Sequence, residues 1–422
     1  LLTATFRGVR VGDLAASSFF NSEFGVGDVQ PHPYLFYTLF EACYLVALAE
    51  RLTKRTGSQP YFAMTPEPSY TSAAAYRCFY KCGAAAIDVY QRCHVIAVVP
   101  PTNSPPANGP TLNSVPRPAR QLSPESRTRV EQYFKLRLSS AAKVLAHMRY
   151  GENDNTAREL VDYEGNPASL TEDRVHCAIF LHSFADAQYY YGLDGFDSLS
   201  HWLFHSIDAC LVNKGIATVV IKPHPSETYR GMHTDAVILR EIMQRYGSNE
   251  RVLLLHPKAS LTRLCSSAPL VGITNHGSVA EELVYLGQPV IASVFAPWGE
   301  HYRFARLWKT QEQYDELIKS INPDSWTPPT EEEKEELVHF ILDQRVCELP
   351  SDRRLPRRIL ALLESRAGVQ AGAPAPNDDH AQHLMGLDNL RLDDARLAAL
   401  LREFEKLPAF IPPAVLQHRP RA

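Results

Sequence analysis

The sequence predicts an α/β protein with two Rossmann-like domains that face each other across a cleft, followed by a C-terminal helical extension. Three observations lead to this prediction. The chain has 422 residues, of which 45% are hydrophobic, and this is enough for two cores. Short apolar runs alternate with segments of helical periodicity, as they do in parallel sheets. Polar residues follow the C-terminal ends of several runs, where open α/β sheets bind ligands.

The first domain, predicted over residues 1–165, begins with a strand. Residues 4–14 alternate apolar and polar side chains and reach a turn at Gly12 and Asp13. The pKa of an acid at a strand exit that faces a closing cleft can rise toward a value useful in general base catalysis. Asp13 is therefore the first candidate for a catalytic base. The alternative is an aspartate that only caps the next helix.

The rest of this domain alternates helix and strand. A helix is predicted from about residue 34 to residue 52, and its apolar run falls short of the roughly 18 residues that suggest a membrane span. A strand over 61–64 and a helix ending near Lys81 follow. Two more strands are predicted over 85–89 and 95–99, and the whole series predicts a parallel sheet.

A loop and a helix lead to the second domain. Residues 100–124 are rich in Pro, Ser and Asn and lack periodicity, which indicates a long surface loop. From Ser123, with Pro124 at the first helical position, a helix is predicted to run to about Met148.

The second domain, predicted over residues 166–345, continues the alternation. Its first strand spans 175–181, and a helix over about 198–213 leads to the next strand. Further apolar runs predicted as strands span 218–221, 252–255, 270–273 and 289–292. A short helix over 301–308 and a longer one over 331–342 complete the domain.

The C-terminal extension is predicted as three pieces. Residues 346–366 form a helical segment, and residues 367–382 have the composition of a flexible linker. Residues 383–422 form a tail with an amphipathic helix over about 393–407. Because isolated helices of this length are marginal, docking on the core is favoured over pairing with a partner.

The strand at 218–221 is followed by Lys222, His224 and Pro225. Prolines on both sides of His224 hold its backbone extended, so that the ring is presented rigidly. A partly protonated imidazole, with a lysine two residues earlier, can neutralise charge on the phosphate of a departing nucleotide. The alternative is a proline-rich strand exit with a solvated histidine.

The strand at 270–273 is followed by Asn275, Gly277, Ser278 and Glu282. A Gly-Ser turn at a helix start leaves backbone N–H groups that suit a phosphate, and the glycine lets the backbone come close. Glu282 lies one helical turn further on, where its carboxylate can accept hydrogen bonds from a ribose diol. The alternative is an acid that only stabilises the helix N-terminus.

The first strand of the second domain is followed by His182 and Asp186. Because the carboxyl ends of parallel strands meet at one edge, we expect both in the same crevice. His182 is expected to contact the donor or its phosphate, and Asp186 to order the loop. Residues 189–191 are three tyrosines that either stack on a ligand or pack in the core.

Composition excludes some classes of function. The formal net charge of −4 provides no basic surface for nucleic acid. Eight cysteines are too few for a disulfide scaffold, and Cys78, Cys82 and Cys93 complete no zinc pattern. We therefore expect a reduced, cytoplasmic setting, no nucleic-acid partner and no metal site.

Several segments together resemble a known family. They are residues 8–13, 180–187, 221–225, 275–282 and 287–291. They look like bacterial capsule and surface-polysaccharide biosynthesis proteins, and most resemble the GT-B glycosyltransferases that use CMP-activated Kdo or related 2-keto sugar acids. The likeness extends from residue 6 to about residue 300.

The resemblance implies that the C-terminal domain holds the sugar nucleotide, while the N-terminal domain presents a glycan or glycolipid acceptor and a catalytic carboxylate. It implies that His224 contacts the donor phosphate, that Ser278 faces this phosphate and that Glu282 lies near the ribose. The donor is then a substrate, and neither a cofactor nor a metal is implied. The charge on the leaving phosphate is stabilised by His224, Lys222 and the backbone amides around Ser278.

Related functions stay open on these residues. The His-Pro and Gly-Ser-x-x-x-Glu motifs are shared with polysialyltransferases, teichoic-acid glycerophosphotransferases and non-hydrolysing UDP-GlcNAc 2-epimerases. A UDP-sugar epimerase, a glycerophosphotransferase-like enzyme and a non-catalytic nucleotide-sugar-binding scaffold are the alternatives. Glu67 and Asp28 are the next candidates for the base. Contact of the C-terminal tail with an assembly complex or with the inner face of a membrane is the alternative to its docking on the core.

Overall fold

The structure is a computed structural model. The residues that it describes are 1–22, 31–56, 62–65, 69–90, 95–99, 121–138, 160–184, 189, 194–224, 233–299, 301–323, 326–342 and 345. Four predictions lie outside these residues: the helical segment over 346–366, the linker over 367–382, the helix over 393–407 and the end of the helix near Met148. Most of the loop over 100–124 lies outside them as well.

A six-stranded sheet forms the centre of the second half of the chain. Its strands are β6 (His176–Phe180), β7 (Val219–Lys222), β8 (Val252–Leu254), β9 (Leu270–Thr274), β10 (Val290–Ser293) and β11 (Arg306–Trp308). Their order is β11-β10-β9-β6-β7-β8, and every neighbouring pair is parallel. The chain thus starts in the middle of the sheet, builds one half and returns to build the other. This confirms the α/β class and the predicted strands of this domain.

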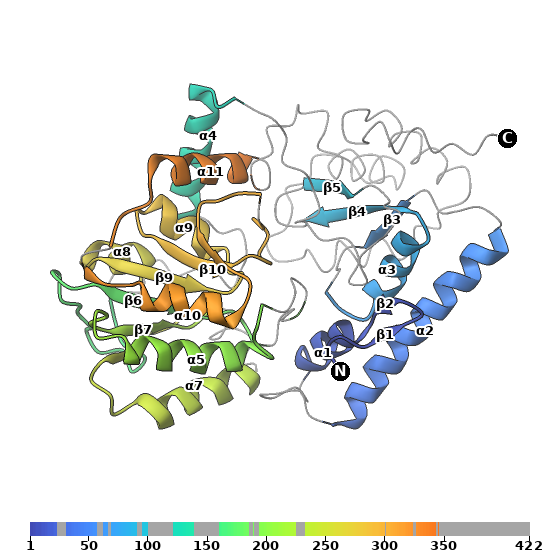
Figure 1. Ribbon diagram of the computed structural model, residues 1–422, viewed down its shortest axis with the longest axis horizontal. Coiled ribbons are helices and arrows are strands. Elements are labelled where there is room, and N and C mark those ends of the chain that lie inside the picture. The colour runs from blue at the N-terminus through green and yellow to red at the C-terminus, as the bar shows by residue number, and fades with distance from the viewer. Residues whose placement is uncertain are drawn as a thin grey trace, which may run out of the picture.

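Helices cover both faces of this sheet. They are α5 (Leu199–Val212), α7 (His233–Tyr246), α8 (Leu261–Ser267), α9 (Val279–Tyr285), α10 (Gln311–Lys319) and α11 (Glu331–Ile341). In Figure 1, α5 and α7 lie on one side of the sheet and α9 and α11 on the other. Strands buried on both faces form near-continuous apolar runs in the sequence, and β6, β7, β9 and β10 are buried at every position.

Strand β11 corrects the predicted short helix over 301–308. Residues 306–308 pair in parallel with β10, and Trp308 is fully buried. The Trp308 ring lies 4.8 Å from the ring of Tyr314 on α10. The edge of β10 offers backbone hydrogen-bond partners and a buried site for the indole, whereas so short a helix is marginal on its own.

The beginning of the chain corrects the predicted strand over 4–14. Two short strands, β1 (Thr5–Phe6) and β2 (Val9–Arg10), pair in antiparallel fashion. The turn between them has positive φ at Arg7 (52°) and Gly8 (73°), which is the geometry of a tight hairpin. Helix α1 (Gly12–Phe20) follows directly, so Asp13 lies in the first turn of a helix and not at a strand exit.

A second sheet contains β3 (Phe62–Thr65), β4 (Ala85–Tyr90) and β5 (Val95–Val99). Strands β3 and β4 are parallel and are connected through α3 (Ala73–Lys81), as predicted. Strand β5 is antiparallel to β4, so the prediction of a wholly parallel sheet is wrong there. A parallel connection needs about a dozen residues or more, and residues 91–94 are too few.

Helix α2 (Pro33–Thr56) runs along the edge of the molecule in Figure 1. One side of it packs Ala42, Val46 and Ala49 against α3 in a small core. In the part of the chain that the structure describes, no helix combines the length and the hydrophobicity required to cross a membrane.

Helix α4 (Pro124–Leu138) packs on the large sheet domain, although its sequence lies within the predicted first domain. Its residues Val130 and Phe134 belong to the core of the large domain. The ring of Phe134 stacks on that of Tyr285 at 4.1 Å. This packing brings the C-terminal end of α4 beside α9. The boundary near residue 165 stays a prediction.

Candidate nucleotide site

Three histidines occupy equivalent positions at one edge of the large sheet. His182 lies two residues past β6, His224 two residues past β7 and His276 two residues past β9. Strands β6 and β9 are neighbours, although they are first and fourth in this domain's chain order, so the topology switches direction between them. In doubly wound sheets the crevice at the carboxyl ends beside this point is where ligands bind.

The rings of these histidines lie close together. The centroid of the His182 ring is 4.2 Å from that of His276 and 6.0 Å from that of His224. The structure therefore brings together His182 and His224, which were expected in one crevice, and adds His276, which was not among the predicted site residues. Their roles in binding stay predictions.

Lys222, at the end of β7, is buried at the same edge of the sheet. Its Nζ donates to the backbone oxygens of Pro257 and, at 3.4 Å, Pro223. Burial lowers the pKa of Lys222 to about 7, although the nearby charge of Glu282 acts in the opposite direction. The side chain is thus held by carbonyl groups at the edge of the sheet.

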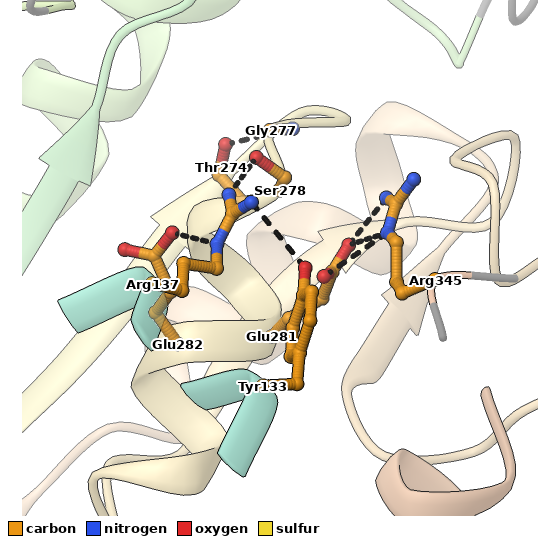
Figure 2. A network of polar contacts seen from close by, with 8 residues as sticks. All are labelled: Tyr133, Arg137, Thr274, Gly277, Ser278, Glu281, Glu282 and Arg345. Atoms are coloured by element: carbon orange, nitrogen blue, oxygen red, sulfur yellow. Dashed lines mark hydrogen bonds and ion pairs between the residues drawn. The ribbon is translucent and has the colours of Figure 1, made fainter. Parts of the chain in front are cut away.

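Arg137, at the end of α4, joins two of the predicted site residues. Its Nε donates to Glu282 Oε1 at 2.5 Å, and its Nη2 donates to Ser278 Oγ at 2.8 Å. Its Nη1 lies 3.3 Å from Tyr133 Oη, an interaction within α4. Figure 2 shows the guanidinium between Ser278 and Glu282. Arg137 is 145 positions from Glu282 in the sequence, and no spacing pattern connects the two.

The start of α9 has the predicted Gly-Ser turn, with Ser278 as the N-cap residue. The side chain of Ser278 makes no capping hydrogen bond and instead accepts from Arg137. The N–H of Gly277 donates to Thr274 Oγ1 at 3.2 Å. A Cβ atom at position 277 would lie 2.7 Å from that same oxygen, so glycine is required for the turn to pack on Thr274.

Glu281 and Glu282 on α9 are each held by an arginine from another part of the chain (Figure 2). Glu282 accepts from Arg137, as described above. Glu281 is completely buried, and its Oε1 accepts from Nε of Arg345 at 3.1 Å. Arg345 lies just past α11, so the two ion pairs tie α9 to α4 and to the segment after α11.

A buried polar chain lies behind the histidines. Asn275 Nδ2 donates to Asp194 Oδ2 at 2.6 Å, and Asn275 Oδ1 lies 2.8 Å from His276 Nδ1. Burial raises the pKa of Asp194 to about 6, against the opposing hydrogen bonds from Asn275 and Ser293. Burial also holds the pKa of His276 well below its ordinary value, and His182 acts in the same direction.

Asp13 has its partner within the N-terminal part of the chain. Its two carboxylate oxygens accept from Arg77 Nη1 at 2.8 and 2.9 Å, and both side chains are buried. Its Oδ1 also accepts from the N–H of Leu14 at 2.9 Å. The structure thus places Asp13 in a buried ion pair between α1 and α3, and its assignment as a base stays a prediction.

Of the other predicted residues, one packs in a core and the rest lie outside the part of the chain that the structure describes. Tyr189 is buried against Phe20, with ring centroids 6.1 Å apart, so it packs in a core. The residues that lie outside the described part are Pro225, Asp186, Tyr190, Tyr191, Glu67 and Asp28. Among the described residues, no group of three or more His, Cys, Asp and Glu side chains has the arrangement of a metal site.

Comparisons with known proteins identify no family. No protein-family model and no curated protein matches the chain. Among solved structures it is similar to Thermosulfurimonas dismutans KpsC, a beta Kdo 2,4 transferase, with 14% identity and a TM-score of 0.38 over 66% of this chain and 86% of that one.

Two further solved structures are similar at lower scores. The Methanocaldococcus jannaschii UDP-GlcNAc 2-epimerase has 11% identity and a TM-score of 0.30, over 78% of this chain and 96% of that one. The S. aureus MnaA structure with UDP has 10% identity and a TM-score of 0.30, over 86% and 95% of the two chains. At such scores none of these likenesses carries an argument about function.

Proposed function

We propose that the chain is a GT-B glycosyltransferase that moves Kdo or a related 2-keto sugar acid from a CMP-activated donor to a surface-polysaccharide or glycolipid acceptor. The observation that carries the proposal is the set of polar groups at the β6/β9 switch point. Histidines from three strand ends lie together there, and Arg137 from α4 binds Ser278 and Glu282 on α9, the helix that follows β9. The choice of CMP and of the sugar acid rests on the motif resemblance.

The phosphate of the donor binds among the cationic groups in this proposal. His224 and His182 lie on neighbouring strand ends, and Arg137 contributes a permanent charge beside the start of α9. Negative charge grows on the phosphate oxygen as the bond to the sugar breaks. Donors that are already oriented stabilise that charge without reorganisation, so no metal is needed for this step.

The ribose binds to Glu282. Arg137 engages Oε1 of this carboxylate and so fixes its orientation. The other oxygen, Oε2, can accept a hydrogen bond from a ribose hydroxyl. The side chain of Glu282 is 18% exposed, which leaves it accessible to a ligand. The acceptor binds on the side of the N-terminal domain.

A panel of CMP- and UDP-sugars, each incubated with the protein with and without glycan acceptors, tests the proposal. CMP release that depends on an acceptor is the expected result. UDP-sugar isomerisation without acceptor would replace the proposal with an epimerase, and glycerophosphate transfer would replace it with a phosphotransferase. Binding without any turnover would indicate a nucleotide-sugar-binding scaffold. A double variant, His224→Ala with Glu282→Ala, controls for contaminating activity.

A further inference from the structure

We infer that Asp194 and Asn275 are positioning residues that fix the tautomer of His276 and thereby make His182 the ring that carries positive charge in the histidine pair. Neither Asp194 nor His276 was among the residues predicted from the sequence. The inference begins at Asp194, whose buried carboxylate receives Asn275 Nδ2 at 2.6 Å. An ionised carboxylate only accepts hydrogen bonds, so the amide nitrogen of Asn275 must face it.

The orientation of Asn275 decides where the proton of His276 lies. With Nδ2 directed to Asp194, the amide oxygen Oδ1 is the atom 2.8 Å from His276 Nδ1. An amide oxygen only accepts, so Nδ1 must carry the hydrogen. Because His276 is only 5% exposed and burial favours the neutral form of the ring, the second nitrogen, Nε2, has no hydrogen.

This tautomer assigns the charge within the pair. Two protonated rings 4.2 Å apart would repel each other, and His276 is the more deeply buried of the two. The Nδ1 of His182 lies 3.2 Å from the carbonyl oxygen of Ser183, which holds a hydrogen on that nitrogen. Any proton that the pair takes up beyond the two neutral rings therefore resides on Nε2 of His182. The resulting cation lies between His276 and His224, where an anionic ligand would meet it.

Nuclear magnetic resonance of the full chain with ¹⁵N-labelled histidine tests the tautomer directly. We expect His276, assigned by the loss of its signals in His276→Gln, to have its hydrogen on Nδ1. Asn275→Leu removes the acceptor and should move the hydrogen to Nε2. His176, whose Nε2 lies 3.0 Å from the carbonyl oxygen of Thr171, is an internal control that should not change. Hydrogen on Nε2 of His276 in the parent protein would overturn the inference.

A second variant keeps the test independent of folding defects. Asp194→Asn retains the size of the side chain but can donate as well as accept, so it should produce a mixture of both His276 tautomers while His176 keeps its signals. An unchanged His276 spectrum in Asp194→Asn and Asn275→Leu alike would show that the chain does not set the tautomer.

The charge assignment is tested with CMP and rests on the proposed function. His182→Gln should weaken CMP binding about tenfold, and Asn275→Leu should add little to that loss, because the charge that Asn275 is inferred to direct to His182 is already absent from His182→Gln. If the losses of CMP affinity in His182→Gln and Asn275→Leu add fully in the double variant, the assignment of the positive charge to His182 is overturned. If CMP does not bind to the parent, the proposed function fails, and inorganic phosphate then serves as the anion in the same double-mutant cycle.

The outer face of α2 carries an independent inference. Large hydrophobic residues that are each at least 39% exposed line it: Phe36, Tyr37, Phe40, Tyr44, Leu48 and Leu52. At 3.6 residues per turn they cover an arc of roughly 160°. Arg51 and Lys54 are exposed at the end of the same helix. Its two glutamates accept hydrogen bonds from Thr71 and Arg7 at 2.7 Å each.

We propose that this face binds the surface of an anionic lipid bilayer. A coiled-coil partner would need a narrow apolar seam, whereas the arc on α2 is broad enough to lie on a flat surface. Phenylalanine, tyrosine and leucine side chains suit the boundary between head groups and acyl chains. Arg51 and Lys54 complement the negative charge of anionic lipids.

Co-sedimentation of the full chain with vesicles tests this proposal. Vesicles that contain phosphatidylglycerol should carry the protein down, and vesicles of phosphatidylcholine alone should carry down much less. The double variant Phe40→Gln with Tyr44→Gln should lose at least tenfold in binding. Val212→Gln, at an exposed apolar residue on α5, is the matched control. Equal binding of the parent and the double variant to the vesicles would overturn the proposal. It would also be overturned if the parent and Val212→Gln formed a dimer in solution and the double variant did not.

Discussion

At the scale of single residues, the structure separates charges that hold the fold from charges that lie at the candidate site. Asp13 and Arg77 form a closed pair, with side chains only 6% and 3% exposed. Removing one partner of a buried ion pair leaves the other charge uncompensated, and this destabilises a protein more than the loss of a surface pair does. Asp13 therefore has a structural role that alternation of side chains could not reveal.

The variant Asp13→Asn should be destabilised by about 3 to 5 kcal/mol, because the Arg77 charge stays buried without its carboxylate. The folded fraction should keep most of its turnover. Urea unfolding and initial rates measure the two effects. Asp197→Asn, a change at a fully exposed side chain, is the control. A hundredfold loss of turnover at unchanged stability would instead identify Asp13 as the base.

Lys222 has a pH-dependent effect on stability whose sign follows from its pKa of about 7, below the ordinary 10.5. Between these values the unfolded chain binds a proton that the folded chain does not, so stability rises with pH. The stability difference between parent and Lys222→Met should be constant below pH 7 and should change by about 1.4 kcal/mol per pH unit above it, in favour of the parent. Urea unfolding from pH 6 to 9 measures it. A difference that does not vary with pH would contradict the burial of this amine.

At the scale of elements, α4 and α9 are joined by the polar side chain of Arg137 as well as by the packing of Phe134 on Tyr285. Arg137 donates to both Glu282 and Ser278, and a planar guanidinium can do this where an ammonium group cannot. Sequence patterns locate α9 and its first residues, because these depend on local turn chemistry. They cannot locate Arg137, because its contact depends on the packing of Phe134 against Tyr285.

The variant Arg137→Met should lose about 1 to 3 kcal/mol of stability, since Glu282 then keeps a partly buried charge without a partner. Arg137→Lys should recover only part of it. Arg127→Met is the matched control on the same helix, because Arg127 and Glu335 form an exposed ion pair worth little. Thermal unfolding measures all three. Equal losses in Arg127→Met and Arg137→Met would contradict the joining role of Arg137.

Much of the fold and part of the site could be predicted from sequence. Strands β6, β7, β9 and β10 are buried at every position and are mostly apolar, and such apolar runs are visible in the sequence. Strand β11 is only 3 residues long and depends on pairing with β10, so no local signal shows it. The contact of Asn275 with Asp194 likewise depends on tertiary packing, since 81 positions separate them.

At the scale of the whole molecule, the described residues form separate hydrophobic cores in the two halves of the chain. The larger core lies around the six-stranded sheet, and a smaller one joins α2 and α3 to the N-terminal strands. Phe20 on α1 and Tyr189 from the large domain meet between them. The candidate site belongs to the larger unit alone, so nucleotide binding should depend on that unit's own side chains.

Calorimetric titration with CMP tests the central claim, that the β6/β9 switch point is a nucleotide site. CMP should bind to the parent, and Glu282→Ala should weaken binding by about 1 to 3 kcal/mol because a ribose hydroxyl loses its acceptor. Glu172 lies beside Pro269 and Gln288 at the amino ends of the strands, so Glu172→Ala should bind CMP like the parent. Parent-like binding by Glu282→Ala and His224→Ala, or no binding of CMP to the parent, would contradict the claim.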